Sequence, residues 1–356
     1  MLHRCIFVRM SWTQTLLHWY DENKRDFPWR GDQDPYRVWL SEVIMQQTRV
    51  EQGTPYFERF IAAFPTLESL AQAPEEEVLK LWQGLGYYSR ARNLLAAARW
   101  MVEENKGEFP NHFKGLLQLK GVGDYTASAI SSICFNEAQA VVDGNVYRFL
   151  SRYFGIATPI DHSSAFREFK ALAQQLMGSS SPGEFNQALM EFGALQCTPK
   201  QPQCQHCPFQ ADCVAFSQGK VAMFPIKKKK LKQRKRFFNY LIFVTPSGNT
   251  FLQQRVHKDI WEKLFEFPLI ETEHLLDGEE LQQHPTFQPW QSKMLGVPRL
   301  LNDSPIKHLL SHQQLMIQFW QISLAEEDTK SLPMTSVDKY PMPIVLADFV
   351  RNVVME

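Results

Sequence analysis

The chain has 356 residues, of which 44% are apolar and 21% are charged, and its 38 basic and 38 acidic side chains cancel. This length allows two domains with separate cores, and the zero net charge means that overall charge does not indicate a nucleic-acid partner. No apolar run approaches the roughly 20 residues of a membrane span, and residues 2–10 are too short and interrupted for a secretory signal. We therefore expect a soluble cytoplasmic protein with no membrane partner.

The basic residues are distributed unevenly along the chain. Residues 1–236 contain 29 basic and 23 acidic side chains, and eight of the basic ones lie in residues 227–236. We interpret residues 226–236 as a solvated basic linker that follows a phosphate backbone, whereas a targeting signal is the weaker alternative. Helical patterns precede the linker and strand patterns follow it, so the sequence predicts one domain over residues 1–225 and another over 237–356.

The first two predicted helices flank a loop that is rich in aromatic and guanidinium groups. Apolar spacing predicts a helix over residues 12–20, and the loop Arg25-Asp26-Phe27-Pro28-Trp29-Arg30 follows it. Such groups stack on bases and hold phosphates, although plain packing is the commoner role of such a loop. The next helix begins near Pro35 and places Glu42 in an apolar run. Most helical glutamates are solvated, but a desolvated one would have a raised pKa and could protonate a leaving group.

Short helices are predicted over residues 57–63, 67–71 and 75–81, and a glycine-containing turn over residues 83–92 follows them. This turn carries Tyr87 among a second tyrosine and several basic residues. Aromatic side chains beside arginines suit insertion into a base stack, and a tyrosine buried in the core is the alternative.

Residues 116–148 contain the motif around which the chain is organised. Helical apolar spacing runs into Gly121-Val122-Gly123 and restarts at once, which predicts two short helices joined by a two-glycine hairpin. Glycines allow close approach of the backbone, and the amides that open the second helix can bind a phosphate, although an ordinary helical turn is the alternative. About twenty residues later Asp143 begins another helical pattern, where it is either a helix N-cap or a catalytic group.

Four cysteines cluster at the end of the helical region in the pattern C-x6-C-x2-C-x5-C, namely Cys197, Cys204, Cys207 and Cys213. Four thiolates this close in sequence can surround one metal centre, which by the residues alone is either zinc or iron-sulfur. His206 is a further candidate ligand of little weight because the cysteines already complete a shell. Cys5 and Cys134 are solitary, so the sequence does not indicate a disulfide framework.

Beyond residue 236 the pattern becomes mixed. Predicted strands over residues 237–244 and 250–254 flank Pro246-Ser247-Gly248-Asn249, which is typical of a hairpin. A helical segment at residues 275–283, a strand at 315–322 and a helix at 344–353 complete a small α+β domain.

The motifs around Glu42, residues 84–92, Gly121, Asp143 and the four cysteines occur in the order of the helix-hairpin-helix DNA glycosylases, and the whole chain resembles the adenine DNA glycosylases of the MutY family. The resemblance implies an all-α glycosylase domain with one lobe over residues 30–137 and another formed by residues 1–29 with 138–225. It implies a [4Fe-4S] cluster on the loop of residues 197–213, followed by a Nudix-like domain over residues 237–356. It also implies a monomer whose partner is double-stranded DNA with an 8-oxoguanine:adenine or guanine:adenine mispair.

The resemblance implies roles for individual residues. Glu42 would protonate the adenine ring, and Asp143 would stabilise the sugar cation or attack it transiently. Tyr125 and Asn145 would orient these groups and the water, and Arg25 would order the site. The implied DNA contacts are the adenine pocket of Trp29, Arg30 and Glu191, the wedge and gap-filling set of Met45, Gln47 and Tyr87, a further substrate contact by Thr48, and the backbone contacts of Gly121 and Gly123.

Two departures from related proteins refine the expectation. Lyase-competent relatives have a Schiff-base lysine where this chain has Tyr125, so we expect a monofunctional enzyme with little strand cleavage. The C-terminal domain lacks the carboxylate-rich box that metal-assisted pyrophosphate hydrolysis needs. Its Leu310-Ser311-His312 matches a Phe-Ser-His loop that reads 8-oxoguanine in the family, with Ser311 and His312 as the expected readers.

Two alternatives remain at the level of sequence. An oxidised-pyrimidine glycosylase and lyase of the endonuclease III type would share the hairpin, Asp143 and the cysteines, but it would not explain Tyr125 or the second domain. A non-catalytic DNA-binding module stabilised by its metal would make Glu42 a surface residue and Asp143 a simple N-cap.

Overall fold

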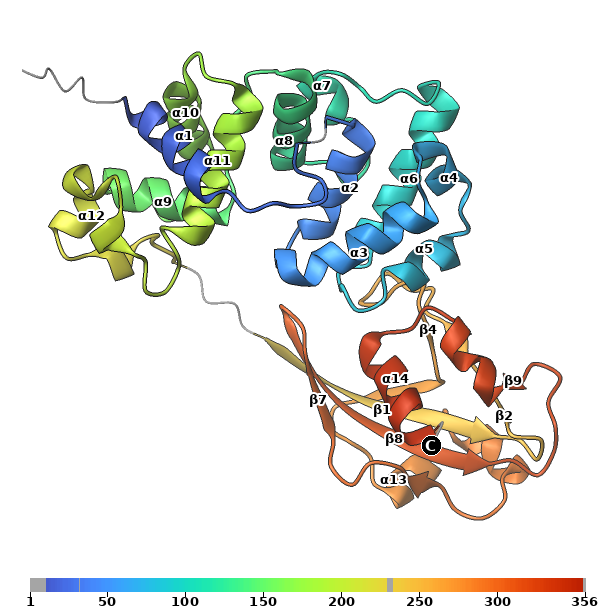
Figure 1. Ribbon diagram of the computed structural model, residues 1–356. Helices are drawn as coiled ribbons and strands as arrows, with labels where there is room; N and C mark the ends of the chain where they lie inside the picture. Colours follow the sequence, from blue (N-terminus) through green and yellow to red (C-terminus); the bar gives the residue numbers. More distant parts are fainter. Residues whose placement is uncertain (1–10, 32, 229–232, 355–356) are drawn as a thin grey trace, which may run out of the picture. The chain divides into compact units, whose positions relative to one another are not determined.

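The computed structural model describes residues 11–31, 33–228 and 233–354 (Figure 1). The chain divides into two compact units, Met1–Gln72 with Asn93–Lys229, and Ala73–Arg92 with Lys230–Glu356. Residues 229–232 in the middle of the predicted linker lie outside the described residues, and strand β1 already begins at Arg234. The division of the helical domain into two lobes, residues 30–137 and residues 1–29 with 138–225, remains a prediction.

The first unit is helical. Ser11 caps its first helix through a capping box with Gln14, and Asp34 caps the second by accepting from the Tyr36 amide. The helices of this unit are α1 (Trp12–Asn23), α2 (Pro35–Met45), α3 (Val50–Ala63), α4 (Leu67–Gln72), α7 (Phe113–Leu116), α8 (Asp124–Phe135), α9 (Gly144–Phe154), α10 (Ala165–Met177), α11 (Pro182–Leu195) and α12 (Val214–Ser217). Helix α6 (Ser89–Glu104) begins in the second unit and continues into this one.

Aromatic side chains from α1, α9 and α11 form one core of this unit. Phe149 and Phe192 are buried with ring centroids 4.3 Å apart, and Phe209 packs against both of them. Trp12 covers this cluster from α1, with its ring 5.1 Å from that of Phe209. Because burial of each large aromatic side chain stabilises a fold by roughly 1.5 to 3 kcal/mol, this cluster fixes α9 against α11.

The predicted two-glycine hairpin forms between α7 and α8. Gly121 has φ +82°, in the left-handed region that favours glycine, and a Cβ there would lie 2.7 Å from Cβ of Asn93. Gly123 is the N-cap of α8 with φ −95° and ψ −178°, and a Cβ there would meet open space. The two glycines thus serve different needs, because only Gly121 is required by backbone geometry.

The second unit is built on a mixed sheet with strand order β5-β1-β8-β6, and β7 also pairs with β8. Its strands are β1 (Arg234–Val244), β5 (Leu269–Thr272), β6 (Arg299–Leu300), β7 (Ile306–Leu309) and β8 (Gln313–Ser323). Strands β1 and β8 run parallel over their whole length, whereas the other pairs are antiparallel. The helices of the unit are α5 (Glu75–Leu81), α13 (Gly278–Gln283) and α14 (Ile344–Phe349), and a π-helical turn, Val350–Val354, follows α14.

The hairpin predicted around residues 246–249 forms only as a turn. The Thr245 amide donates to the Asn249 carbonyl at 2.9 Å, which closes the turn. The returning segment then splits into β2 (Asn249–Thr250), paired with β9 (Leu332–Pro333), and β3 (Gln253–Gln254), paired with β4 (Phe265–Glu266). The prediction of a continuous hairpin strand over residues 250–254 was therefore wrong, because both edges of β1 are taken by β5 and β8.

The second unit also includes residues 73–92, which the sequence places in the first lobe of the helical domain. Arg92 holds this segment by donating to the carboxylate and to the carbonyl of Glu262, both at 2.7 Å. The side-chain oxygen of Gln83 accepts from the Met342 amide at 3.3 Å. These long-range contacts have no counterpart in local sequence patterns. Within the described part of the chain, every helix is too short or too polar to cross a bilayer.

Candidate active site

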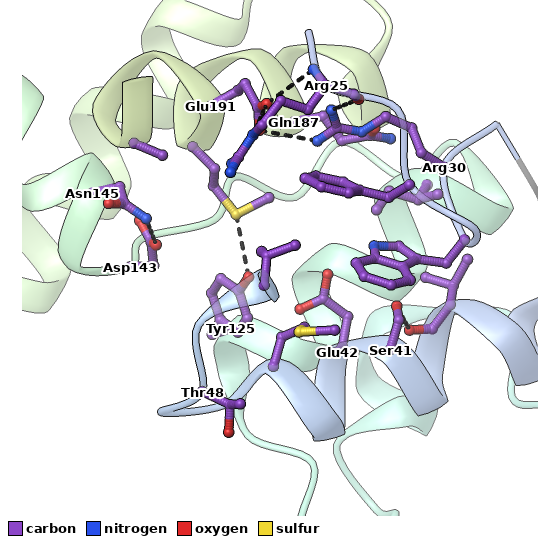
Figure 2. A pocket seen from close by; sticks show the side chains of 18 residues that line it. Arg25, Arg30, Ser41, Glu42, Thr48, Tyr125, Asp143, Asn145, Gln187 and Glu191 are labelled. Carbon is purple, nitrogen blue, oxygen red and sulfur yellow. Dashed lines mark hydrogen bonds and ion pairs between the residues drawn. The ribbon is translucent and has the colours of Figure 1, made fainter. Parts of the chain in front are cut away.

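A cavity of about 210 Å³ in the helical unit gathers most of the site residues predicted from the sequence. Its walls come from the loop between α1 and α2, from α2 itself, from the start of α8 and α9, and from α11. Figure 2 shows the carboxyl group of Glu42 pointing into this cavity while Asp143 lies at its other side. The predicted residues that line it are Arg25, Trp29, Arg30, Glu42, Met45, Thr48, Tyr125, Asp143, Asn145 and Glu191.

Glu42 lies on the face of α2 that is otherwise apolar, next to the fully buried Trp39 and Ile44. Burial raises its pKa from 4.5 to about 7, the nearby charge of Asp143 adds to this rise, and an interaction with the Tyr125 hydroxyl partly offsets it. The sequence left open whether Glu42 is solvated or desolvated, and the structure places it in the desolvated environment. A carboxyl group with this pKa carries a proton in a large fraction of molecules at neutral pH.

Asp143 is the N-cap of α9 and follows two buried valines, Val141 and Val142. Its Oδ1 accepts from the Val146 amide at 2.8 Å and its Oδ2 accepts from Nδ2 of Asn145 at 2.7 Å. Burial raises the pKa of Asp143 above its usual value, while these hydrogen bonds and the charge of Arg148 act in the opposite direction. Since both partners can only donate, they favour the ionised carboxylate. Asp143 is thus an N-cap and a cavity residue at once.

Arg148 supports Asn145 from the next turn of α9. Its NH2 group donates to Oδ1 of Asn145 at 2.8 Å, so the amide is oriented with Nδ2 toward Asp143. The Nε of Arg148 donates to the Cys197 carbonyl at 2.7 Å, which ties this helix to the start of the cysteine loop. The orientation of the Asn145 amide is therefore fixed on both sides.

Tyr125 lies near the start of α8 and is partly buried. Its hydroxyl donates to Sδ of Met190 at 3.2 Å. Burial raises the pKa of Tyr125 well above its usual value, and the charges of Glu42 and Asp143 add to the rise. The phenol therefore stays protonated and can only contribute a neutral hydrogen-bond group to the cavity.

Glu191 on α11 binds the two arginines of the loop between α1 and α2. It accepts from Nε of Arg25 at 2.8 Å and from NH2 of Arg30 at 3.1 Å, and only 4% of its side chain is exposed. Burial alone would raise its pKa, but the hydrogen bonds from Arg25 and Arg30 outweigh burial and lower it. Glu191 is therefore an ionised anchor. Trp29 lies in the same loop, stacked on Phe27 with centroids 5.2 Å apart.

Eight cavity residues were not predicted as site residues from the sequence, namely Phe27, Val38, Ser41, Val50, Ile133, Gln187, Met190 and Ala194. Six of them lie within the predicted aromatic loop, on α2 or on α11, so their closeness in sequence to Trp29, Glu42 and Glu191 could have indicated them. Val50 is the first residue of α3. Ile133 lies at the end of α8 and faces the cavity only through tertiary packing.

Some predicted residues lie outside this cavity. Gln47 and Tyr87 both have positive φ, 58° and 48°, which is uncommon for residues other than glycine. A second cavity of about 360 Å³ within the other unit is lined by Tyr87, Ser311 and His312. The hydroxyl groups of Tyr87 and Ser311 are hydrogen-bonded to each other there. The hairpin glycines Gly121 and Gly123 are exposed and line neither cavity.

The four clustered cysteines surround a small cavity of about 30 Å³ whose other lining includes Phe149, Phe192 and Phe209. All four are free thiols, and burial raises the pKa of Cys207 to about 12, with the three neighbouring thiols adding to the rise. An NH1 group of Arg152 donates to Sγ of Cys197 at 3.4 Å. Four sulfur donors in an apolar pocket with one guanidinium fit an iron-sulfur centre in chemistry. Among the described residues, however, no three Cys, His or carboxylate side chains converge in a geometry that could hold a metal ion.

Comparisons with known proteins identify the fold and the family of the chain. Residues 40–175 match the family described as HhH-GPD superfamily base excision DNA repair protein, and residues 239–352 match the NUDIX domain. The helical unit is similar to the structure of a thermostable thymine-DNA glycosylase, with a TM-score of 0.54 and 29% identity over 58% of this chain and 95% of that one. A non-covalent endonuclease III-DNA complex, 21% identical with a TM-score of 0.50 over 59% of this chain and 99% of that one, shares the fold. The fold and site thus define a base excision DNA glycosylase with a C-terminal Nudix-like domain.

Curated relatives narrow this class to one family. The adenine DNA glycosylase of Buchnera aphidicola subsp. Schizaphis graminum is 36% identical over 263 residues, which is 73% of this chain and 75% of that protein. The adenine DNA glycosylase of Mus musculus is 34% identical over 378 residues, covering 91% of this chain and 72% of the mouse protein. The chain belongs to the adenine DNA glycosylase family.

Proposed function

We propose that this chain acts as a monomer on duplex DNA and removes adenine that is mispaired with 8-oxoguanine or guanine, without cutting the strand itself. The observation that carries the proposal is the pair of unlike carboxyl groups in one cavity. Glu42 has a pKa raised to about 7, whereas Asp143 accepts hydrogen bonds on both oxygens from groups that can only donate. Since its substrate would be chromosomal DNA, we expect it in the bacterial cytosol with the nucleoid.

The proposed chemistry uses the two carboxyl groups for opposite charges. Breaking the bond between base and sugar leaves a cationic sugar and a negatively charged base. Glu42 donates its proton to the adenine ring, so that the base leaves as a neutral molecule. The Asp143 carboxylate then stabilises the sugar cation or bonds to it transiently before water completes the hydrolysis. Asn145 holds the Asp143 carboxylate in place through its 2.7 Å hydrogen bond.

The proposed adenine pocket combines an aromatic wall with a rigid charged one. Trp29 offers a ring face for the flipped base, and its stacking on Phe27 restricts its rotation. Arg25 and Arg30 are held by Glu191, whose hydrogen-bonding capacity they largely use. We therefore assign Glu191 the role of fixing these two arginines. Met45 and Thr48 line the same cavity, which supports their proposed place beside the extruded nucleotide.

Tyr125 supports a monofunctional mechanism. Strand cleavage by this class requires an amine that forms a Schiff base with the sugar, and no lysine lines the cavity among the residues that the structure describes. We expect borohydride treatment during turnover to trap little or no covalent protein-DNA complex. Trapping in high yield would contradict this proposal.

We propose that lesion reading resides in the second unit. Ser311 and His312 are exposed, and with Tyr87 they line the cavity of about 360 Å³. A hydroxyl and an imidazole can both donate to the additional carbonyl oxygen and accept from the additional N–H of 8-oxoguanine. If Ser311→Ala combined with His312→Ala leaves the preference for 8-oxoguanine over guanine unchanged, these two residues are not the readers.

We infer that Cys197, Cys204, Cys207 and Cys213 hold a [4Fe-4S] cluster. When bound, it would supply a covalent tie between the end of α11 and the loop before α12, without a part in base removal. Purified protein should contain about four iron and four sulfide per chain. One zinc per chain, with no iron, would show a structural zinc site instead.

The proposal is tested by base release from three duplexes that carry adenine opposite 8-oxoguanine, guanine or thymine. We expect release from the first at the highest rate, slower release from the second and none from the third. The strand should break only after alkali. Release of oxidised pyrimidines, but not of adenine, would favour the endonuclease III type of activity. Glu42→Gln provides the control for any contaminating enzyme.

A further inference from the structure

Arg236 is a buried cation in the second unit, outside both cavities. It is the third residue of β1, and 7% of its side chain is exposed. Its Nε and NH2 donate to the two carboxylate oxygens of Glu271 at 2.7 and 2.6 Å, and its NH1 and NH2 donate to those of Asp259 at 3.0 and 2.7 Å. Its NH1 also donates to Oε1 of Gln313 at 3.0 Å. These five bonds use all five N–H groups of the guanidinium.

Gln313 immediately follows the Ser311-His312 turn. The turn joins β7 to β8, and the Leu310 amide closes it by donating to the Gln313 carbonyl at 2.8 Å (Figure 1). On the other side, the Arg234 amide donates to the His312 carbonyl at 3.0 Å. The backbone of the turn is therefore attached to β1, and the side chain of Gln313 adds a second attachment through Arg236.

The second partner of Arg236 belongs to the wall of the cavity that the turn lines. Asp259 lines this cavity together with Ser311 and His312. Its Oδ2 also accepts from NH2 of Arg255 at 3.0 Å, so the carboxylate is held by two cations. One guanidinium thus joins Gln313 at the base of the turn to Asp259, and both residues line the cavity.

The geometry of this arrangement requires arginine. Its guanidinium is planar and presents its donors in fixed directions, whereas a lysine ammonium offers three donors on a flexible chain. The carboxylates of Asp259 and Glu271 neutralise the charges of Arg236 and Arg255, and both carboxylates are partly exposed whereas the two guanidinium groups are largely buried. Displacing Arg236 would leave Asp259 and Glu271 short of donors, which favours a single position for the turn.

We propose that Arg236 is a positioning residue for lesion discrimination. By binding both Gln313 and Asp259, it fixes the position of the Ser311-His312 turn relative to Asp259. This inference rests on the proposed function of Ser311 and His312 as readers. It makes Gln313 and Asp259, which line the same cavity as Ser311 and His312, specificity determinants through their bonds to Arg236. Catalysis in the helical unit does not depend on this network.

The test compares two truncations in the full-length protein, Gln313→Ala and Glu271→Ala. Each removes one partner of Arg236, but only Gln313 adjoins the turn, so Glu271→Ala is the matched control. The measurement is the ratio of kcat/KM for adenine opposite 8-oxoguanine to that opposite guanine. We expect Gln313→Ala to lower this ratio about fivefold, the effect of one lost hydrogen bond, with kcat opposite 8-oxoguanine unchanged. Glu271→Ala should leave the ratio within about twofold of the wild type.

The double variant with Ser311→Ala and His312→Ala separates the two levels of the hypothesis. If this variant keeps the wild-type ratio, the proposed readers are wrong and the role of Arg236 falls with them. If it loses the preference while Gln313→Ala keeps it, the readers stand and the positioning role is overturned. Arg236→Lys adds a variant that retains the positive charge, and thermal melting shows whether it folds as the wild type does. If the folded Arg236→Lys protein keeps the wild-type ratio of kcat/KM values, the positioning role of Arg236 is also overturned.

Discussion

Nδ2 of Asn145 donates to Oδ2 of Asp143 at 2.7 Å, and the opposite end of the same amide accepts from Arg148. The amide is therefore held in one orientation, and it directs a neutral donor at the carboxylate proposed to face the sugar cation. A carboxylate held from both sides needs no rearrangement when positive charge develops on the substrate.

Asn145→Ala should lower the rate of adenine release roughly 10- to 100-fold, the effect expected when a charged acceptor loses one hydrogen bond of about 1.5 to 3 kcal/mol. Single-turnover kinetics on the duplex with 8-oxoguanine measures this effect. Gln187→Ala is the matched control, because Gln187 lines the same cavity but its side-chain oxygen accepts from Tyr20. Equal losses in the two variants would indicate a general disturbance of the cavity.

Glu42→Gln should abolish base release and change the pH dependence of stability. The folded-state pKa of Glu42, about 7, lies above its usual value of 4.5, so the folded state binds the proton more tightly than the unfolded state does. Its contribution to stability is complete below pH 4.5 and is lost as the pH rises through 7. Urea unfolding should therefore show that the stability of the variant, measured relative to wild type, rises by about 2 to 3 kcal/mol between pH 5 and pH 8.

The exposed Glu58 on α3 provides the control for this shift. Glu58→Gln should show no such gain across the same range of pH. A constant difference between Glu42→Gln and wild type from pH 5 to pH 8 would mean that the pKa of Glu42 is not raised on folding.

The rate of adenine release should fall tenfold for each pH unit above about 7, because the proposed mechanism requires the proton of Glu42. On the acid side, the rate should fall as Asp143 becomes protonated, and burial places the pKa of Asp143 above its usual range. Single-turnover rates between pH 5 and pH 9 measure both limbs. A rate that keeps rising above pH 8 would exclude Glu42 as the acid.

Glu191→Gln should destabilise the helical unit by about 2 to 3 kcal/mol, because the charges of Arg25 and Arg30 would lose their buried partner. Glu184→Gln is a matched control, since Glu184 lies on the same helix but is exposed. The pKa of Glu191 is lowered on folding, so the difference from wild type should shrink as the pH falls below 4.5. Urea unfolding at pH 7 and pH 4 measures both effects.

Substitutions at the two hairpin glycines should have different effects on stability and on DNA binding. Gly121→Ala forces φ +82° on a residue with a side chain and places Cβ 2.7 Å from that of Asn93, so it should cost about 1 to 3 kcal/mol of stability. Gly123→Ala meets open space and should change stability by less than about 0.5 kcal/mol. It should still weaken duplex binding, measured by fluorescence anisotropy, if the amides of α8 contact a phosphate. If Gly123→Ala binds the duplex with unchanged affinity, the amides at the start of α8 do not contact a phosphate.

Much of the helical unit could be predicted from the sequence because its determinants are local. Asp34 followed by Pro35 marks the start of α2, and apolar spacing around Glu42 marks the buried face of that helix. The sequence left undecided whether Asp143 is an N-cap or a catalytic group. In the structure Asp143 has the geometry of an N-cap and also lines the cavity. The same carboxylate caps α9 and lines the cavity, so the N-cap and the proposed catalytic role are not exclusive interpretations.

Non-local pairing could not be predicted. The partner of β1 is β8, and nothing near residue 240 in the sequence indicates a parallel strand beginning at Gln313. The hairpin predicted around residues 246–249 forms only as a turn, because strands from distant parts of the chain occupy both edges of β1. The ionic contacts of Glu191 with Arg25 and Arg30 join residues more than 150 positions apart, and their burial is a property of the folded unit alone.

The parallel pairing of β1 with β8 has a consequence for the order in which the protein is made. Asn239 and its neighbour across the sheet, Gln318, are 79 positions apart. At typical elongation rates, roughly 4 to 16 s pass between their synthesis on the ribosome. During that interval the apolar residues Leu241, Ile242 and Phe243 of β1 cannot yet pair with β8, while the helices through residue 228 have already been synthesised. The helices of the first unit are thus synthesised well before the sheet of the C-terminal domain can be completed.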